Sequence, residues 1–156
     1  MNSPPEQSVH LALQLLAERR FGVMIRQLSE SGLSTADALE AAWPLLTRRL
    51  RVDGVLLVAA GNGCYQKVCR VLRRTADEAD AVASQWTLES STTILDRAAA
   101  REALPSTLIA KVVCVATSMG RSPLRAEQVM YLLGREECVR RLRFACTYLE
   151  SANLIG

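Results

Sequence analysis

Apolar residues recur at helical spacing along most of the chain, and this periodicity limits the possible folds more than any other feature. The strongest stretch, Leu108–Met119, is apolar over several helical turns and is followed by Gly120. Weaker patterns of the same kind run over 9–28, 124–133 and 136–152. Glycine commonly follows the last turn of a helix. The sequence therefore predicts a mainly α-helical fold.

One stretch departs from this periodicity, GVLLVAAGNGCYQKVC. It places two short runs of residues that favour strands, Val55–Ala60 and Cys64–Cys69, on either side of Asn62-Gly63. Asn-Gly is a preferred two-residue hairpin turn, because both positions must adopt a positive φ. We therefore predict a β-hairpin here, after three helices: one over 9–28, a short one capped by Ser34 or Thr35, and a third over 44–53.

Three helices followed by a hairpin are typical of a winged-helix module. A second set of helices after residue 105 repeats the order weakly, with Gly32 and Gly120 each lying two residues before a serine. We expect a mainly α fold with a small β-hairpin, in a tandem winged-helix-like arrangement. The predicted divisions are a flexible N-terminus, a first module, connecting helices and a second module, over 1–8, 9–70, 71–104 and 105–156.

The connecting region reads as a helix over 70–88, a polar break over Glu89–Thr93 and a second helix over 94–103. At the other end of the chain, 153–156 reads as a strand cut short. The second module would thus lack its own hairpin. Either this module is a wingless helix-turn-helix, or a partner or a missing part of the chain completes its sheet, a partner by adding a strand.

The last predicted helix carries the stretch RRLRFACTYLESANLI. Arg140 and Arg141 begin this stretch, and Leu149-Glu150 precede the supposed strand. This stretch resembles part of the DNA-binding domain of the heterodimeric winged-helix factors that control cell-cycle transcription. It lacks the tyrosine–aspartate pair that follows the arginines in that family. The two-module layout is similar to the tandem winged-helix subunits of eukaryotic RNA polymerase III. These resemblances imply a DNA-binding subunit of a transcription assembly.

Charge permits such a role without requiring it. The net charge of +3 and the pI of about 8.7 lie below the strongly basic range that marks many nucleic-acid-binding domains. In the last helix, the apolar residues share one side and the basic residues lie opposite, flanked by Phe144 and Tyr148. We predict contacts with nucleic acid or a protein partner at Arg48, Arg49, Arg51, Lys67, Arg70, Arg73, Arg74, Arg140, Arg143, Thr147 and Tyr148.

Signatures of catalysis are weak. His10 is the single histidine, and the five cysteines match no standard zinc spacing and contain no CxxC pair. Gly61-Asn62-Gly63 lacks the surrounding residues of a phosphate-binding loop. We therefore expect no enzyme activity, no cofactor and no metal, with the cysteines acting as small buried apolar residues.

The sequence favours a non-catalytic winged-helix subunit or adaptor of a nucleic-acid-associated assembly, which binds DNA, protein partners or both. A helical scaffold that binds only protein is the alternative, and a small enzyme is the second one. The chain shows no secretory signal and no apolar run of about 18 residues. We expect an intracellular protein of the nucleus or cytoplasm, or of the nucleoid in a bacterium, without contact with a membrane.

Overall fold

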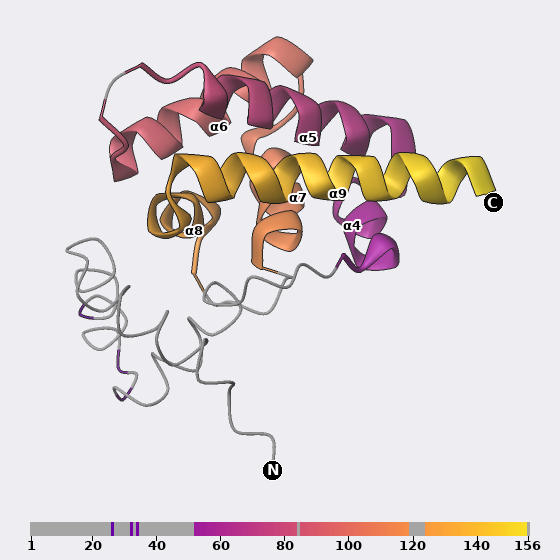
Figure 1. The fold of residues 1–156 in the computed structure, drawn as a ribbon, viewed down its shortest axis with the longest axis horizontal. Helices are drawn as coiled ribbons and strands as arrows, with labels where there is room; N and C mark the ends of the chain where they lie inside the picture. The colour runs from indigo at the N-terminus through magenta and orange to yellow at the C-terminus, as the bar shows by residue number, and fades with distance from the viewer. Residues whose placement is uncertain are drawn as a thin grey trace. The chain divides into compact units, whose positions relative to one another are not determined.

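The computed structural model describes residues 26, 32, 34, 52–83, 85–118 and 124–155. Within them, Figure 1 shows a helical unit with no strand. The prediction of a mainly α protein is therefore confirmed, and the predicted β-hairpin and winged-helix fold are wrong for this part of the chain. The helices are α4 (Gly54–Ala60), α5 (Tyr65–Asp80), α6 (Leu88–Glu102), α7 (Ser106–Ser118), α8 (Ala126–Leu133) and α9 (Arg135–Ile155).

Helix α7 lies at the centre of this unit and contacts each of the other five helices. Its sequence explains its position, since apolar residues occupy most of its circumference and a helix that is apolar all round is stable only when it is buried. Ile109, Val112 and Val113 have no exposed surface. The other helices each turn a narrower apolar stripe toward this centre.

The predicted hairpin is wrong because both of its runs are helical. Val55–Ala60 lies within α4, and Cys64–Cys69 comprises the N-cap residue and the first turns of α5. The side chain of Asp53 accepts a hydrogen bond from the N–H of Leu56 at 3.0 Å and so caps α4. Burial in the helical core outweighs the β-propensity of these short runs, since such propensity depends strongly on context.

The turn between these helices nevertheless has the conformation that its sequence predicts. Asn62 and Gly63 adopt φ values of 60° and 78°. Their N–H groups donate to the carbonyls of Ala59 and Val58, at 3.1 and 2.9 Å. These two bonds form the Schellman motif, in which a left-handed residue ends a helix and satisfies its last carbonyls. The same Asn-Gly pair that suits a hairpin therefore joins two helices here.

Three further predictions about secondary structure are wrong. The helix predicted over 70–88 ends at Asp80. The stretch Glu89–Thr93 is not a break but part of α6, because Thr87 caps this helix and exchanges hydrogen bonds with Ser90. The final residues of the chain do not begin a strand, since α9 continues to Ile155. A partner that adds a strand has no sheet to extend among the described residues.

The chain divides into two units, Met1–Arg49 and Leu50–Gly156. In the first, Arg26 is helical and Gly32 lies in a turn with a φ of 101°. The other predicted helices before residue 52 lie outside the described residues, and the domain boundaries stay a prediction. None of the described helices is both long enough and apolar enough to cross a bilayer.

Candidate nucleic-acid interface

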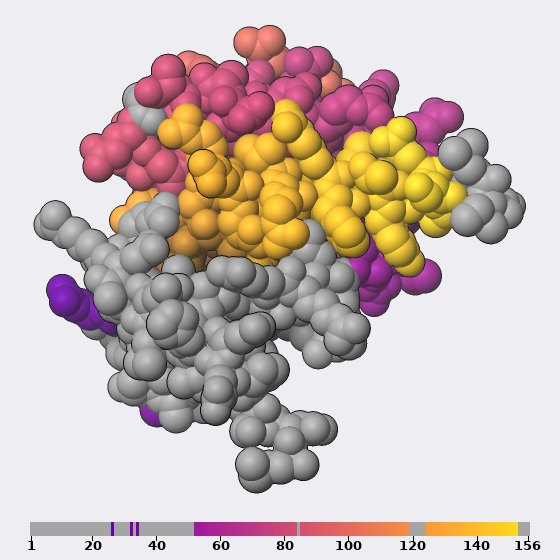
Figure 2. All heavy atoms as spheres, in the orientation of Figure 1, coloured from indigo at the N-terminus to yellow at the C-terminus, as the bar shows by residue number. Residues whose placement is uncertain are grey.

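Helices α5 and α9 lie side by side and antiparallel, and they present most of the predicted contact residues (Figure 1). Ion pairs join these helices. Arg73 on α5 pairs with Glu150 on α9 at 3.2 Å, and Arg143 on α9 pairs with Asp80 on α5 at 3.3 Å. In Figure 2 the side chains of α9 form a band on the surface beside those of α5.

The predicted division of α9 into an apolar side and a polar side is confirmed. Its inward side is almost fully buried and comprises Cys138, Leu142, Ala145, Cys146 and Leu149. On the outward side, Arg140, Arg143 and Thr147 are exposed. Phe144 and Tyr148 are 43% and 44% exposed, which is unusual for aromatic side chains.

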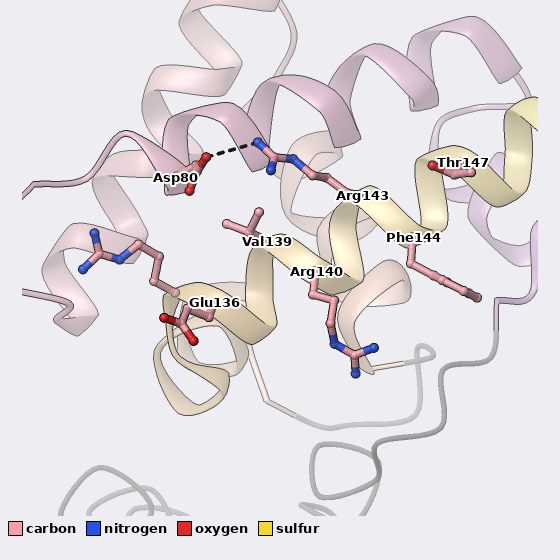
Figure 3. Close-up of a pocket in the computed structure, with 8 residues that line it drawn as sticks. Asp80, Glu136, Val139, Arg140, Arg143, Phe144 and Thr147 are labelled. Atoms are coloured by element: carbon pink, nitrogen blue, oxygen red, sulfur yellow. Dashed lines mark hydrogen bonds and ion pairs between the residues drawn. The ribbon is translucent and has the colours of Figure 1, made fainter.

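An open groove of about 840 Å³ follows the outward side of α9. Figure 3 shows Arg140 and Phe144 extending from the same side of the helix, while Arg143 reaches toward Asp80 on α5. The walls of the groove combine cationic, anionic, apolar and hydroxyl side chains. They comprise Asp80, Arg135, Glu136, Val139, Arg140, Arg143, Phe144 and Thr147.

The arginines of the outward side are held by carboxylates. Arg140 donates two hydrogen bonds to Glu137, at 2.8 and 2.9 Å. Arg143 lies 3.5 Å from Asp77 and 3.3 Å from Asp80. Burial raises the pKa of Glu137, but hydrogen bonds from Arg140 and Arg141 and their charges outweigh this effect and hold the pKa below its ordinary value. The face is therefore mixed in charge, whereas the sequence predicted a basic one.

Arg141, which the resemblance matched together with Arg140 to the family's arginine pair, is buried. Its side chain is 3% exposed and donates to Glu137 at 2.8 Å and to the carbonyl of Thr117 at 2.7 Å. That carbonyl belongs to the last turn of α7, where a helix has unsatisfied acceptors and a negative dipole end. Arg141 thus joins α9 to α7 and cannot read bases.

The basic residues predicted on α5 form ion pairs with neighbouring helices. Arg74 and Arg70 lie 3.1 and 3.6 Å from Glu102 of α6, and Arg73 pairs with Glu150. Lys67 is half-buried on the same helix. The arginines of α5 therefore contact two different helices, Arg70 and Arg74 facing α6 and Arg73 facing α9. The remaining predicted contacts, Arg48, Arg49 and Arg51, lie outside the described residues.

The buried cysteines have the properties of apolar core residues. Cys69, Cys138 and Cys146 are buried and free, as predicted, whereas Cys64 is exposed. Burial, followed by a hydrogen bond to Glu150, raises the pKa of Cys146 to about 12. Burial likewise raises the pKa of Cys138 to about 12. Thiols with such pKa values are poor nucleophiles and poor metal ligands at neutral pH.

Sequence reasoning missed part of the groove. Asp77 and Asp80 approach Arg143 across more than sixty positions of the chain, and no local pattern announces such a contact. Arg135 donates to the carbonyl of Val82, which also depends on the packing of α9 against the end of α5. Phe144, which the sequence places on the flank of the basic side, is not among the predicted contacts, although it shares its face with Arg140 and Tyr148 at helical spacing.

The described residues thus define a class, a helical domain with arginine, carboxylate and aromatic side chains gathered on one face. A model of the anticodon-binding domain family matches residues 18–146. This match covers most of the chain, and the chain therefore belongs to the anticodon-binding domain family. A comparison with curated proteins found no match.

Membership of this family overturns the winged-helix resemblances. Neither the cell-cycle transcription factors nor the RNA polymerase III subunits describe this chain, since its family and its helical structure both differ from theirs. The coarser part of the functional prediction is confirmed, because an anticodon-binding domain is a nucleic-acid-binding domain. The predicted role in transcription depended on these resemblances and therefore has no support.

Proposed function

We propose that this chain is a non-catalytic domain that binds transfer RNA, and that the outward side of α9 takes part in this contact. The family match over residues 18–146 carries the proposal. The groove supports it independently, since it offers arginines, an exposed ring and a hydroxyl group within one surface. Proteins recognise RNA loops through combinations of this kind, with phosphate contacts for position and stacking for unpaired bases.

The absence of a chemical step is the second part of the proposal. It is supported by the raised pKa values of Cys138 and Cys146, which keep both thiols protonated at neutral pH. His10, the single histidine and the residue on which Cys–His or Ser–His catalysis would depend, lies outside the described residues. In our proposal the domain supplies affinity and selectivity for the RNA, and another protein segment performs any reaction on it.

A protein partner is a second candidate function, which does not exclude the first. It is favoured by two apolar side chains of α4, since Val55 is 84% exposed and Leu56 is 41% exposed. Adjacent exposed apolar residues of this size occur often at contacts with other proteins. The sequence-based expectation of an intracellular location fits both a protein partner and a tRNA partner.

A titration with tRNA tests the main proposal. The full chain should bind an intact tRNA, with affinity that falls as salt rises, because phosphate contacts release counterions. Replacing the anticodon bases of the same tRNA should weaken binding more than replacing base pairs in its acceptor stem. A folded chain that binds no tRNA at about 50 mM salt would refute the proposal. A chain that prefers the acceptor stem would refute the contact with the anticodon.

A further inference from the structure

Two aromatic rings on the outward side of α9 stand one helical turn apart. Phe144 and Tyr148 are separated by four residues, so that their side chains project from the same face. Both are nearly half exposed, although apolar rings of this size usually contribute to a core. Among the described residues the exposed large apolar side chains comprise these two and the α4 pair, Val55 and Leu56.

Tyr148 is supported from below by the start of α4. A Cβ atom added to Gly54 would lie 3.4 Å from Cε1 of Tyr148, which is an ordinary van der Waals contact. The ring therefore rests against the backbone of α4. A larger side chain at residue 54 would displace it, which gives this ring a defined position despite its exposure.

The spacing of the two rings favours RNA whose neighbouring bases are unstacked. Four residues of α-helix rise about 6 Å, whereas bases in a stacked strand are about 3.4 Å apart. Two consecutive bases can each lie on one ring only when they are splayed out of the regular stack. Loops and other single-stranded segments allow this arrangement, and a duplex does not.

The charges around the rings also favour unpaired RNA over a duplex. Glu137 holds Arg140, and Asp77 and Asp80 hold Arg143, so that each guanidinium already has an anionic partner. A phosphate that approaches must compete with these carboxylates, which lowers the affinity for any polyanion that offers phosphates alone. Stacking then has to supply a larger share of the binding.

We propose that Phe144 and Tyr148 form a platform that stacks two unpaired bases of RNA, and that Asp77 and Asp80 suppress binding of paired RNA by holding Arg143. This inference depends on the proposed function, because it names the part of the RNA that the α9 face recognises. The platform supplies selectivity for unpaired bases. The carboxylates act on the phosphate contacts through the ion pairs that they form with Arg143.

The platform is tested with two RNA probes, the anticodon stem-loop of a tRNA and a blunt duplex built from the same stem. In the full chain, Phe144→Leu and Tyr148→Leu should each weaken binding of the stem-loop about 10-fold, with little effect on the duplex. Phe144→Tyr and Tyr148→Phe keep a ring at each position and should retain most of the affinity. Val55→Ala serves as a control for the loss of an exposed apolar side chain outside the platform.

The carboxylates are tested by Asp77→Asn combined with Asp80→Asn. The double variant should bind the duplex several-fold more tightly, and its affinity should depend more steeply on salt, since Arg143 becomes available to phosphate. Unchanged duplex binding would overturn the role of the carboxylates. Leucine variants that bind the stem-loop as tightly as the wild type would overturn the platform. In both cases wild-type binding of tRNA would leave the proposed function standing, whereas its absence would remove both proposals.

Discussion

The corner between α4 and α5 and the long helix α9 differ in how far their sequences determine their structure. In α9, buried and exposed residues alternate at helical spacing over about five turns, and the predicted faces are the observed ones. At the corner, each apolar run has only a few residues, and a run of this length and composition is compatible with either a strand or a helix. The comparison shows that periodicity identifies an element only when the element is long enough to repeat.

The largest effect should come from the buried side of α9. Leu142→Ala removes a side chain with no exposed surface, so that we expect a loss of about 4 kcal/mol in the free energy of unfolding. Leu56→Ala at the corner removes the same atoms from a side chain that is 41% exposed, and should cost under about 1 kcal/mol. Urea denaturation of both variants measures the difference. Equal losses of stability would contradict the burial of Leu142 and the exposure of Leu56.

Arg141 should have the next largest effect. Arg141→Met removes a buried guanidinium that bonds Glu137 and the carbonyl of Thr117, and should cost about 3 kcal/mol. Arg140→Met, in the exposed position beside it, should cost under about 1 kcal/mol because surface ion pairs contribute little. Thermal and urea unfolding of the pair tests whether adjacent arginines have these separate roles. Similar costs would show that Arg141 is not an internal support.

The corner itself can be tested through its glycines. A Cβ atom at Gly61 would lie 2.2 Å from Cγ2 of buried Val68, so that Gly61→Ala should cost about 2 kcal/mol. At Gly63 a Cβ meets nothing within 4 Å, and the cost of about 1 kcal/mol would come from the positive φ alone. Adding Val68→Ala should reduce the cost of the Gly61 change. A hairpin would place the greater sensitivity at Gly63, so the order of the two glycines separates the structures.

The sequence predicted some features of the fold because their causes are local. The positive φ values of Asn62 and Gly63, the end of α8 at Gly134 and the two sides of α9 all depend on residues within a few positions. The helical state of Val55–Ala60 depends on packing against α7, which no short window contains. Thr87 did carry a readable capping signal, which the polar composition of Glu89–Thr93 obscured.

The candidate site divides in the same way. The exposure of Arg140, Thr147 and Tyr148 follows from the periodicity of α9, and the sequence therefore located this face. Its charge does not follow, because Asp77 and Asp80 reach Arg143 from another helix. A count of basic residues along the chain thus overestimates the positive charge that the folded surface offers to RNA.

The smallest effect concerns Glu137, the carboxylate that pairs with Arg140 and Arg141. The pKa of Glu137 is lowered in the folded chain, so that its ionised form is stabilised by folding. This contribution is complete above the ordinary glutamate pKa of about 4.3 and is lost as the pH falls through the lower folded value. Carboxyl NMR titration should place the Glu137 pKa below the ordinary value, and Arg140→Met with Arg141→Met should raise it. If the double variant left the pKa of Glu137 unchanged, the hydrogen bonds from these arginines would not be its cause, and the charge pairing inferred for the α9 face would need another basis.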